Sequence, residues 1–331
     1  MSEPAPRKRK ARAVTLALQI GVSVALVAAL VFVVDWQGLR QAAAALSIGG
    51  VIGVVLLNFL AQASLIWRWR ALLATVGVHE SFGRSWRTVF AGLFLNNFMP
   101  GTLGLDGLRI LLMGRACGSM AVAIGAIAYE RAMQVSIYVL LIVFASLWPM
   151  GWLAPWLHLT IVATGGFAVL ALLLLLKWLS GRRISGAPAG AGLLLRGWSF
   201  LGAMLAETGR MQVRLRHHRG AQAQFFISSL FNVGCVLALF AVALHDLGRP
   251  VDLPVIVFAV GIAAIVSGLP ISFGGIGVYE AALVLLLGLG GVPSGDALLV
   301  ALVVRGASIA VTLLGLPSAL LMWRERASQM G

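Results

Sequence analysis

Six charged residues lie within stretches of the chain that are otherwise apolar. A charge at the centre of a membrane helix costs at least ~2.5 kcal/mol, so these side chains are expected to face the protein interior and to be paired or hydrated. An arginine guanidinium stays ionised and presents a planar fork of donors that fits phosphate oxygens. The pattern predicts a buried site for a phosphate-bearing group, with a purely structural ion-pair cluster as the alternative. The residues are Asp106, Arg109, Glu130, Arg131, Glu280 and Arg305.

The acidic members of this set have two candidate roles. They can hold the arginines in place, or Glu130 or Glu280 can take up and release a proton during a transport cycle, and the sequence leaves both roles open. Asp106 and Arg109 are three residues apart and share a helix face, so they can pair with each other. Asn97 is a candidate polar lining residue of the same site, or a residue that packs one helix against another.

Two motifs near these charges combine proline and glycine at the same spacing. In each, a proline is followed by glycines four and seven residues later, within NNFMPGTLGLDGLR at 96–109 and PISFGGIGVYE at 270–280. Proline cannot donate to a helix ladder and glycine lowers the cost of irregular backbone, so each motif is expected to interrupt a helix. Such breaks at membrane depth are tolerated only inside protein or beside a wet cavity. The expected break residues are Pro100, Gly104, Gly107, Pro270, Gly274, Gly275 and Gly277.

The composition of the chain identifies the elements that must position these residues. Of 331 residues, 60% are hydrophobic and 11% are charged, and the mean hydropathy is +0.97. Soluble domains carry about 25% charged residues, so an all-α polytopic membrane protein is predicted, with about six full transmembrane helices. Two further apolar runs, 88–115 and 254–291, contain the motifs and are predicted to be broken or re-entrant helix pairs. The six spanning runs are 14–34, 49–67, 119–148, 157–176, 222–244 and 297–322.

The positions of the basic residues orient these segments. When the tail 1–13 is placed inside, 20 of the 25 basic residues lie inside, including Arg68 and Arg70, two lie outside and three lie in the membrane. Basic residues concentrate in cytoplasmic loops, so the sequence predicts an integral plasma (inner) membrane protein with both termini cytoplasmic. The formal net charge of +14 then belongs to loops on one side, and no nucleic-acid partner is expected.

The same orientation predicts an inverted repeat within a single membrane domain that covers residues 1–331. Segments 49–148 and 222–322 each hold a span, a broken pair and a second span, in opposite directions. The helix 157–176 links them, and the broken pairs are either re-entrant or two full crossings. Paired interruptions in two inverted halves indicate the substrate site of a transporter.

The segment 180–220 combines arginines with aromatic and aliphatic residues near helical spacing. Such a mixture is typical of an amphipathic helix that lies on an anionic leaflet, so anionic lipid at the cytoplasmic surface is an expected partner. An ordinary basic loop between the two halves is the alternative.

No cofactor and no metal are expected. Cys117 and Cys235 are far apart, and the five histidines are scattered without the spacing of a metal site.

The chain resembles the flippase-like membrane family related to the transmembrane region of lysylphosphatidylglycerol synthases, over about residues 14–322. That family shows an asparagine-rich approach to a proline, then glycines, an aspartate and an arginine, a Glu-Arg pair, and later a Pro…Gly-Gly-x-Gly-Val-x-Glu stretch. The matching residues are Asn97, Pro100, Gly104, Asp106, Arg109, Glu130, Arg131, Pro270, Gly274, Gly275, Gly277, Val278 and Glu280. The resemblance implies a membrane protein that handles a lipid or lipid-linked substrate, commonly by moving it between leaflets.

We therefore expect a lipid flippase or translocase for a phosphate-bearing lipid or a polyprenyl-phosphate-linked sugar. The alternatives are a membrane-embedded transferase with a lipid-linked donor, or a small-solute transporter of the broken-helix type. An enzyme is the less favoured interpretation. The resemblance implies that the family's synthases carry a soluble aminoacyl-transfer domain after the membrane part, and no such domain is expected in a chain that ends at Gly331.

Overall fold

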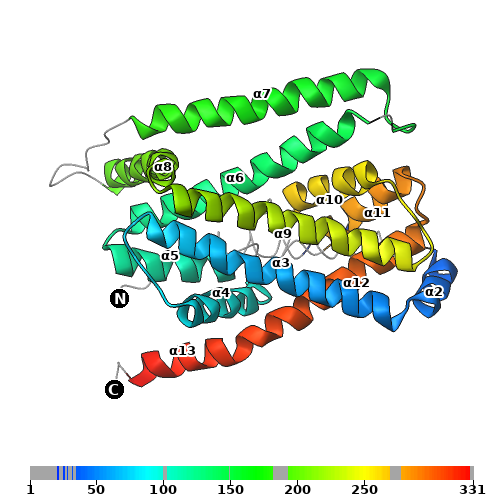
Figure 1. The fold of residues 1–331 in the computed structure, drawn as a ribbon, viewed down its shortest axis with the longest axis horizontal. Helices are drawn as coiled ribbons and strands as arrows, with labels where there is room; N and C mark the ends of the chain where they lie inside the picture. The colour runs from blue at the N-terminus through cyan, green and yellow to red at the C-terminus, as the bar shows by residue number, and fades with distance from the viewer. Residues whose placement is uncertain are drawn as a thin grey trace.

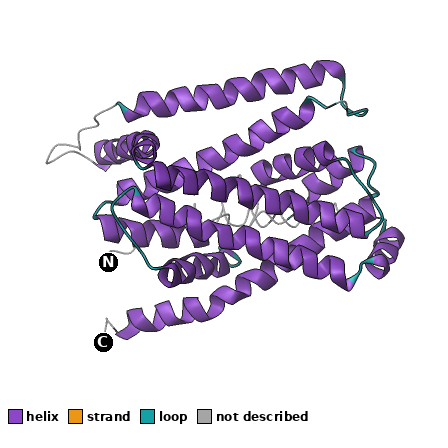
Figure 2. Ribbon diagram, viewed as in Figure 1, coloured by secondary structure: helices purple, strands orange, loops and turns teal. Residues whose placement is uncertain are grey.

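The computed structural model describes residues 35–99, 103–148, 150–181, 193–268 and 277–328, together with five isolated residues before Asp35. All regular secondary structure in this described part is helical (Figures 1 and 2). The predicted all-α class is therefore confirmed. The predicted first span, 14–34, lies almost entirely outside the described residues.

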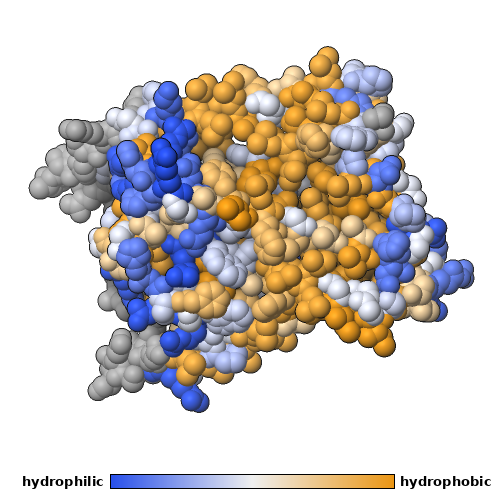
Figure 3. Space-filling model, viewed as in Figure 1, coloured by the Kyte–Doolittle hydropathy of each residue, from blue (hydrophilic) through white to orange (hydrophobic). Residues whose placement is uncertain are grey.

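Five helical segments among the described residues are long and apolar enough to cross a membrane. They correspond to the predicted spans from 49 onwards. Charged and polar surface flanks a broad apolar band at both ends of the molecule (Figure 3), as expected for a chain that spans a bilayer. The segments are α3 (Ile48–Ala74), α6 (Met120–Ser146), α7 (Pro155–Ser180), α9 (Arg219–Asp246), and α12 (Ser294–Thr312), which continues through the 3-10 turn Leu313–Gly315 into α13 (Leu316–Ser328).

Four shorter helices occupy the two runs that carry the proline and glycine motifs. They have 15, 15, 15 and 12 residues. At 1.5 Å per residue each is about 18–22 Å long, shorter than the ~30 Å hydrocarbon core of a bilayer. One pair lies toward the left end of the molecule in Figure 1 and the other toward the right end. The helices are α4 (Phe82–Asn96), α5 (Leu103–Cys117), α10 (Leu253–Ser267) and α11 (Val278–Leu289).

The helices therefore stop where the motifs predicted, although several of the expected break residues cannot be placed. Pro100, Pro270, Gly274 and Gly275 lie outside the described residues. Gly277 has φ of +83°, a conformation that glycine adopts without strain, and it directly precedes α11.

Gly104 and Gly107 lie on α5 and differ in their surroundings. A Cβ atom on Gly104 would clash with the backbone of Leu95 and Asn96, whereas a Cβ atom on Gly107 would meet nothing within 4 Å. Gly104 thus permits the close approach of α4 and α5, and Gly107 does not have this role.

Gly104→Ala is expected to force α4 and α5 apart and to cost about 1–3 kcal/mol of stability. Gly107→Ala is the matched control and should be neutral or stabilising by up to about 1 kcal/mol, because alanine favours a helix. Melting temperatures of the purified variants in detergent measure both effects. Equal melting temperatures for the two variants would contradict this account of Gly104.

The long helices α3 and α9 run antiparallel at the centre of the fold (Figure 1) and are joined at three levels. At one end, the backbone nitrogen of Ser47 donates to Asp246 at 2.8 Å. In the middle, Asn232 Nδ2 donates to the carbonyl of Ala61 at 2.7 Å, and at the other end Gln224 Nε2 donates to the carbonyl of Trp67 at 2.9 Å. These bonds fix the register of the two helices.

The predicted amphipathic segment 180–220 contains α8 (Leu193–His217) and a stretch outside the described residues. In Figure 1 this helix is seen nearly end-on, across the direction of α6 and α7, against which it packs. It lies at the strongly hydrophilic end of the molecule (Figure 3). Its contact with anionic lipid stays a prediction.

Candidate functional site

The most deeply buried charges form a cluster around Glu130 of α6. Its carboxylate accepts hydrogen bonds from Arg109 of α5, with Nη2 at 2.5 Å and Nη1 at 3.3 Å. Arg68 of α3 lies on the other side, with its Nε 2.8 Å from Glu130 Oε1. The exposed fractions of Arg68, Arg109 and Glu130 are only 3%, 1% and 2%. One carboxylate is therefore shared by two buried guanidinium groups from two different helices.

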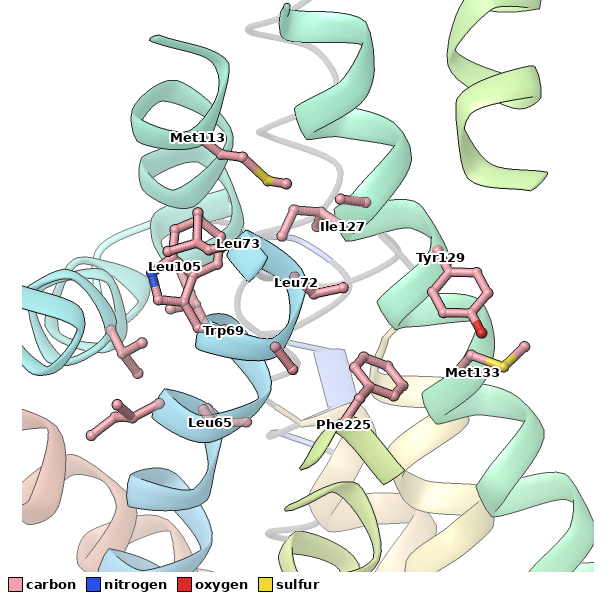
Figure 4. Packing of buried hydrophobic residues seen from close by; sticks show 14 of the residues in the cluster. Leu65, Trp69, Leu72, Leu73, Leu105, Met113, Ile127, Tyr129, Met133 and Phe225 are labelled. Atoms are coloured by element: carbon pink, nitrogen blue, oxygen red, sulfur yellow. The ribbon is translucent and has the colours of Figure 1, made fainter. Parts of the chain in front are cut away.

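Apolar and aromatic side chains pack around this cluster. The guanidinium of Arg109 lies over the ring of Trp69, 4.7 Å from its centroid, which adds a cation–π contact. Figure 4 shows Trp69 and Leu73 of α3 facing Leu105 of α5, and all three belong to the buried hydrophobic core. Electrostatic interactions are stronger in such surroundings than in water.

A second ion pair lies next to the cluster around Glu130. Arg131 donates to Asp106 in a bidentate geometry, with Nε at 3.0 Å and Nη2 at 2.8 Å, and its Nη1 donates to Gln134 at 3.3 Å. Asp106 is buried, whereas the Arg131 side chain is 36% exposed. Asp106 and Arg109, which share a helix face, approach only to 3.9 Å. Each therefore has a closer partner on α6.

A third ion pair belongs to the second half of the chain. Glu280, in the first turn of α11, pairs with Nε of Arg305 on α12. Its other oxygen accepts from the backbone nitrogen of Gly277 at 2.8 Å, so the break glycine also holds the carboxylate. The Arg305 side chain is 29% exposed.

The second and third ion pairs have the same design. Asp106 and Arg131 are 25 residues apart, and so are Glu280 and Arg305. In both, the acid lies in the first turn of a short helix and the arginine lies on the long helix that follows. In both, the acid is buried and the arginine is partly exposed.

Two tyrosines interact with residues of the ion pairs. Tyr138 of α6 hydrogen-bonds with Gln134, which also accepts from Arg131. Tyr279 of α11 is within electrostatic range of Tyr138 and of Arg305. The structure therefore brings four of the seven predicted polar site residues, Asp106, Arg109, Glu130 and Arg131, into one network with Arg68, while Glu280 and Arg305 form a separate ion pair.

Asn97 is placed apart from the ion pairs. It caps the end of α4, and its Nδ2 donates to Thr312 Oγ1 of α12 at 2.8 Å. This bond joins the end of α4 to the end of α12. The observed contact of Asn97 is therefore one that packs two helices together, which was the second of its two predicted roles.

Arg68 is the site residue that the sequence analysis missed. The sequence analysis counted it among the basic residues on the inside and not among the site residues, whereas the structure buries its side chain beside Glu130, within a helix that continues to Ala74. The available signal was the apolar run 71–73, which continues the helix beyond the arginine.

No metal site accompanies the ion pairs in the described part of the chain. Among those residues, no group of three or more His, Cys, Asp or Glu side chains is placed to hold a metal ion. The chemistry that this donor set offers is the binding of an anion by guanidinium groups.

The long apolar helices and the buried ion pairs define a helical integral membrane protein with a charged site inside its membrane region. The chain belongs to the family of the lysylphosphatidylglycerol synthase TM region, which matches residues 17–315. The predicted family is thereby confirmed. No curated protein sequence matches the chain.

Proposed function

We propose that this protein is a lipid flippase, which moves a phosphate-bearing lipid or a polyprenyl-phosphate-linked sugar between the leaflets of the plasma (inner) membrane. The family supports an action on lipids, because it is named after a synthase of lysylphosphatidylglycerol, a phospholipid. The ion-pair network supports a phosphate-bearing substrate.

The observation that carries the proposal is the surplus of positive charge in the buried network. Among the described residues, Arg68, Arg109 and Arg131 face only two carboxylates, those of Asp106 and Glu130. The segments 100–102 and 269–276, which lie outside the described residues, contain no acidic residue that could balance the third arginine. An uncompensated charge in a low-dielectric interior is costly, and one anionic group would offset it.

A partly exposed arginine supplies the donors for such a group. Arg305 uses Nε for Glu280, and its two terminal nitrogens form no hydrogen bond or ion pair with the described residues. These two nitrogens form the fork that binds a phosphate with two hydrogen bonds. Arg305 would thus bind the head group through this fork, whereas Arg131, whose three nitrogens already donate to Asp106 and Gln134, would add positive charge together with Arg68 and Arg109.

An inverted repeat would let the same site face either leaflet in turn. It would pair α3–α6 with α9–α12, and the equal spacing of the two acid–arginine pairs supports it. The two short-helix pairs also lie toward opposite ends of the molecule (Figure 1). Rocking of one repeat against the other is the usual mechanism of alternating access in such folds. The excess of basic residues at one end supports cytoplasmic termini.

Reconstitution into liposomes tests the proposal. Protein-containing vesicles should move a fluorescent phosphatidylglycerol or polyprenyl phosphate across the bilayer faster than protein-free vesicles, while a fluorescent phosphatidylcholine should move less. Failure to move any anionic lipid, with or without a proton gradient, would contradict a flippase. Product formation from a lipid-linked donor by detergent-solubilised protein would favour the transferase alternative instead.

A further inference from the structure

A polar cavity lies on the side of α3 that faces away from the buried ion pairs. It has a volume of about 390 Å³ and is bounded by the end of α3, the connection 75–81 and the beginning of α9. Arg68 and Trp69 are buried in the interior, whereas the residues on either side of them in the sequence, Trp67 and Arg70, line this outer cavity. The volume is in the range of small-ligand sites.

We propose that this cavity binds the head group of a phospholipid that carries both a phosphate and a primary ammonium group, as in phosphatidylethanolamine. The site is separate from the proposed translocation site, and its occupation does not require transport.

The cationic half of the cavity is formed by Arg70, with His79 beside it. Arg70 forms no hydrogen bond or ion pair with the described residues, so its guanidinium fork is available. A phosphate is the group that best matches a free guanidinium fork at the end of a membrane helix.

The anionic half is formed by Glu80. Its Oε2 accepts a hydrogen bond from Ser85 Oγ at 3.2 Å, which orients the carboxylate, and it forms no ion pair with Arg70 although both line the cavity. A monoanionic ligand would gain from Arg70 but be repelled by Glu80. A zwitterionic head group satisfies both charges, and a primary ammonium can donate hydrogen bonds to the carboxylate.

The walls place the cavity at the level of lipid head groups. Trp67 is 44% exposed, and its ring lies 5.8 Å from that of Phe82. Amphipathic aromatic rings of this kind are enriched where the membrane meets water. The hydrogen bond from Gln224 to the carbonyl of Trp67 joins the two helices that form the walls.

Native mass spectrometry of the full chain tests the assignment, with phosphatidylethanolamine, phosphatidylcholine and phosphatidylglycerol added separately. The wild type should bind phosphatidylethanolamine about tenfold more tightly than the other two, the effect of one charge-assisted hydrogen bond. Glu80→Gln should abolish this preference, and Arg70→Gln should weaken binding of all three lipids about tenfold. Arg84→Gln is the control, because Arg84 is exposed on the neighbouring α4 and does not line the cavity.

Equal binding of the three lipids by the wild type would overturn the proposal, and so would wild-type selectivity in both cavity variants. Soluble glycerophosphoethanolamine distinguishes a lipid from a free head group. It should bind much more weakly than the lipid, and equal binding would overturn the assignment to a membrane lipid. If a variant fails to fold, the proposal is tested by the wild type alone, through its preference for phosphatidylethanolamine over the other two lipids.

Discussion

Replacing Glu130 with glutamine is expected to destabilise the protein by about 3–5 kcal/mol, the typical cost of removing one partner from a buried ion pair. The substitution leaves Arg68 and Arg109 facing each other with no carboxylate between them. Both guanidinium groups are buried, so water cannot screen their repulsion. The melting temperature and the yield of folded protein in detergent should both fall.

The double variant Arg68→Gln, Glu130→Gln separates this mechanism from a general loss of packing. Removing one arginine with the carboxylate lowers the repulsion, so the double variant should be more stable than the sum of the two single variants predicts. Glu207→Gln is a control, because Glu207 pairs with Arg210 and Arg214 in the partly exposed α8. If Glu130→Gln melts at the wild-type temperature, the cluster does not contribute to stability as described.

Replacing Arg305 has the largest expected effect on transport. Arg305→Gln removes two charge-assisted hydrogen bonds to the proposed phosphate, each worth about 1.5–3 kcal/mol, so anionic lipid should move about a hundredfold more slowly. The rate is measured as the initial loss of accessible fluorescent lipid in proteoliposomes. Because this variant also leaves Glu280 without its arginine, it is expected to lower stability as well.

Arg305→Lys separates the two effects. Lysine keeps the charge opposite Glu280 but lacks the planar fork, so the melting temperature should stay close to that of the wild type while transport slows about tenfold. Arg324→Gln is the control, since Arg324 is exposed on α13 and far along the chain from the ion pairs. Wild-type transport by both Arg305 variants would show that this side chain does not bind the substrate.

Much of the fold could be predicted from the sequence because its signals are local. Apolar length predicted the long helices, and the motifs around Pro100 and Pro270 predicted where helices stop, since backbone conformation there depends on the residues themselves. The membrane charges were recognised for the same reason, as polar residues in apolar runs.

The partners of those charges could not be predicted, because they depend on how helices pack. Asp106 and Arg109 were candidates to pair with each other, yet each has a closer partner on α6. Arg68 was counted among the basic residues on the inside, and only the packing around α3 shows that its side chain is buried in the network. The surplus positive charge of the site depends on that single residue.

The three hydrogen bonds between α3 and α9 limit how this molecule can change shape. Sliding one helix along the other by a single turn, 5.4 Å, would break the contacts of Asp246, Asn232 and Gln224 together. The two central helices therefore keep a fixed register with each other. In the proposed transport cycle the two repeats would therefore rock about α3 and α9 without sliding along them, and the short helices that hold Asp106 and Glu280 would make the larger movement.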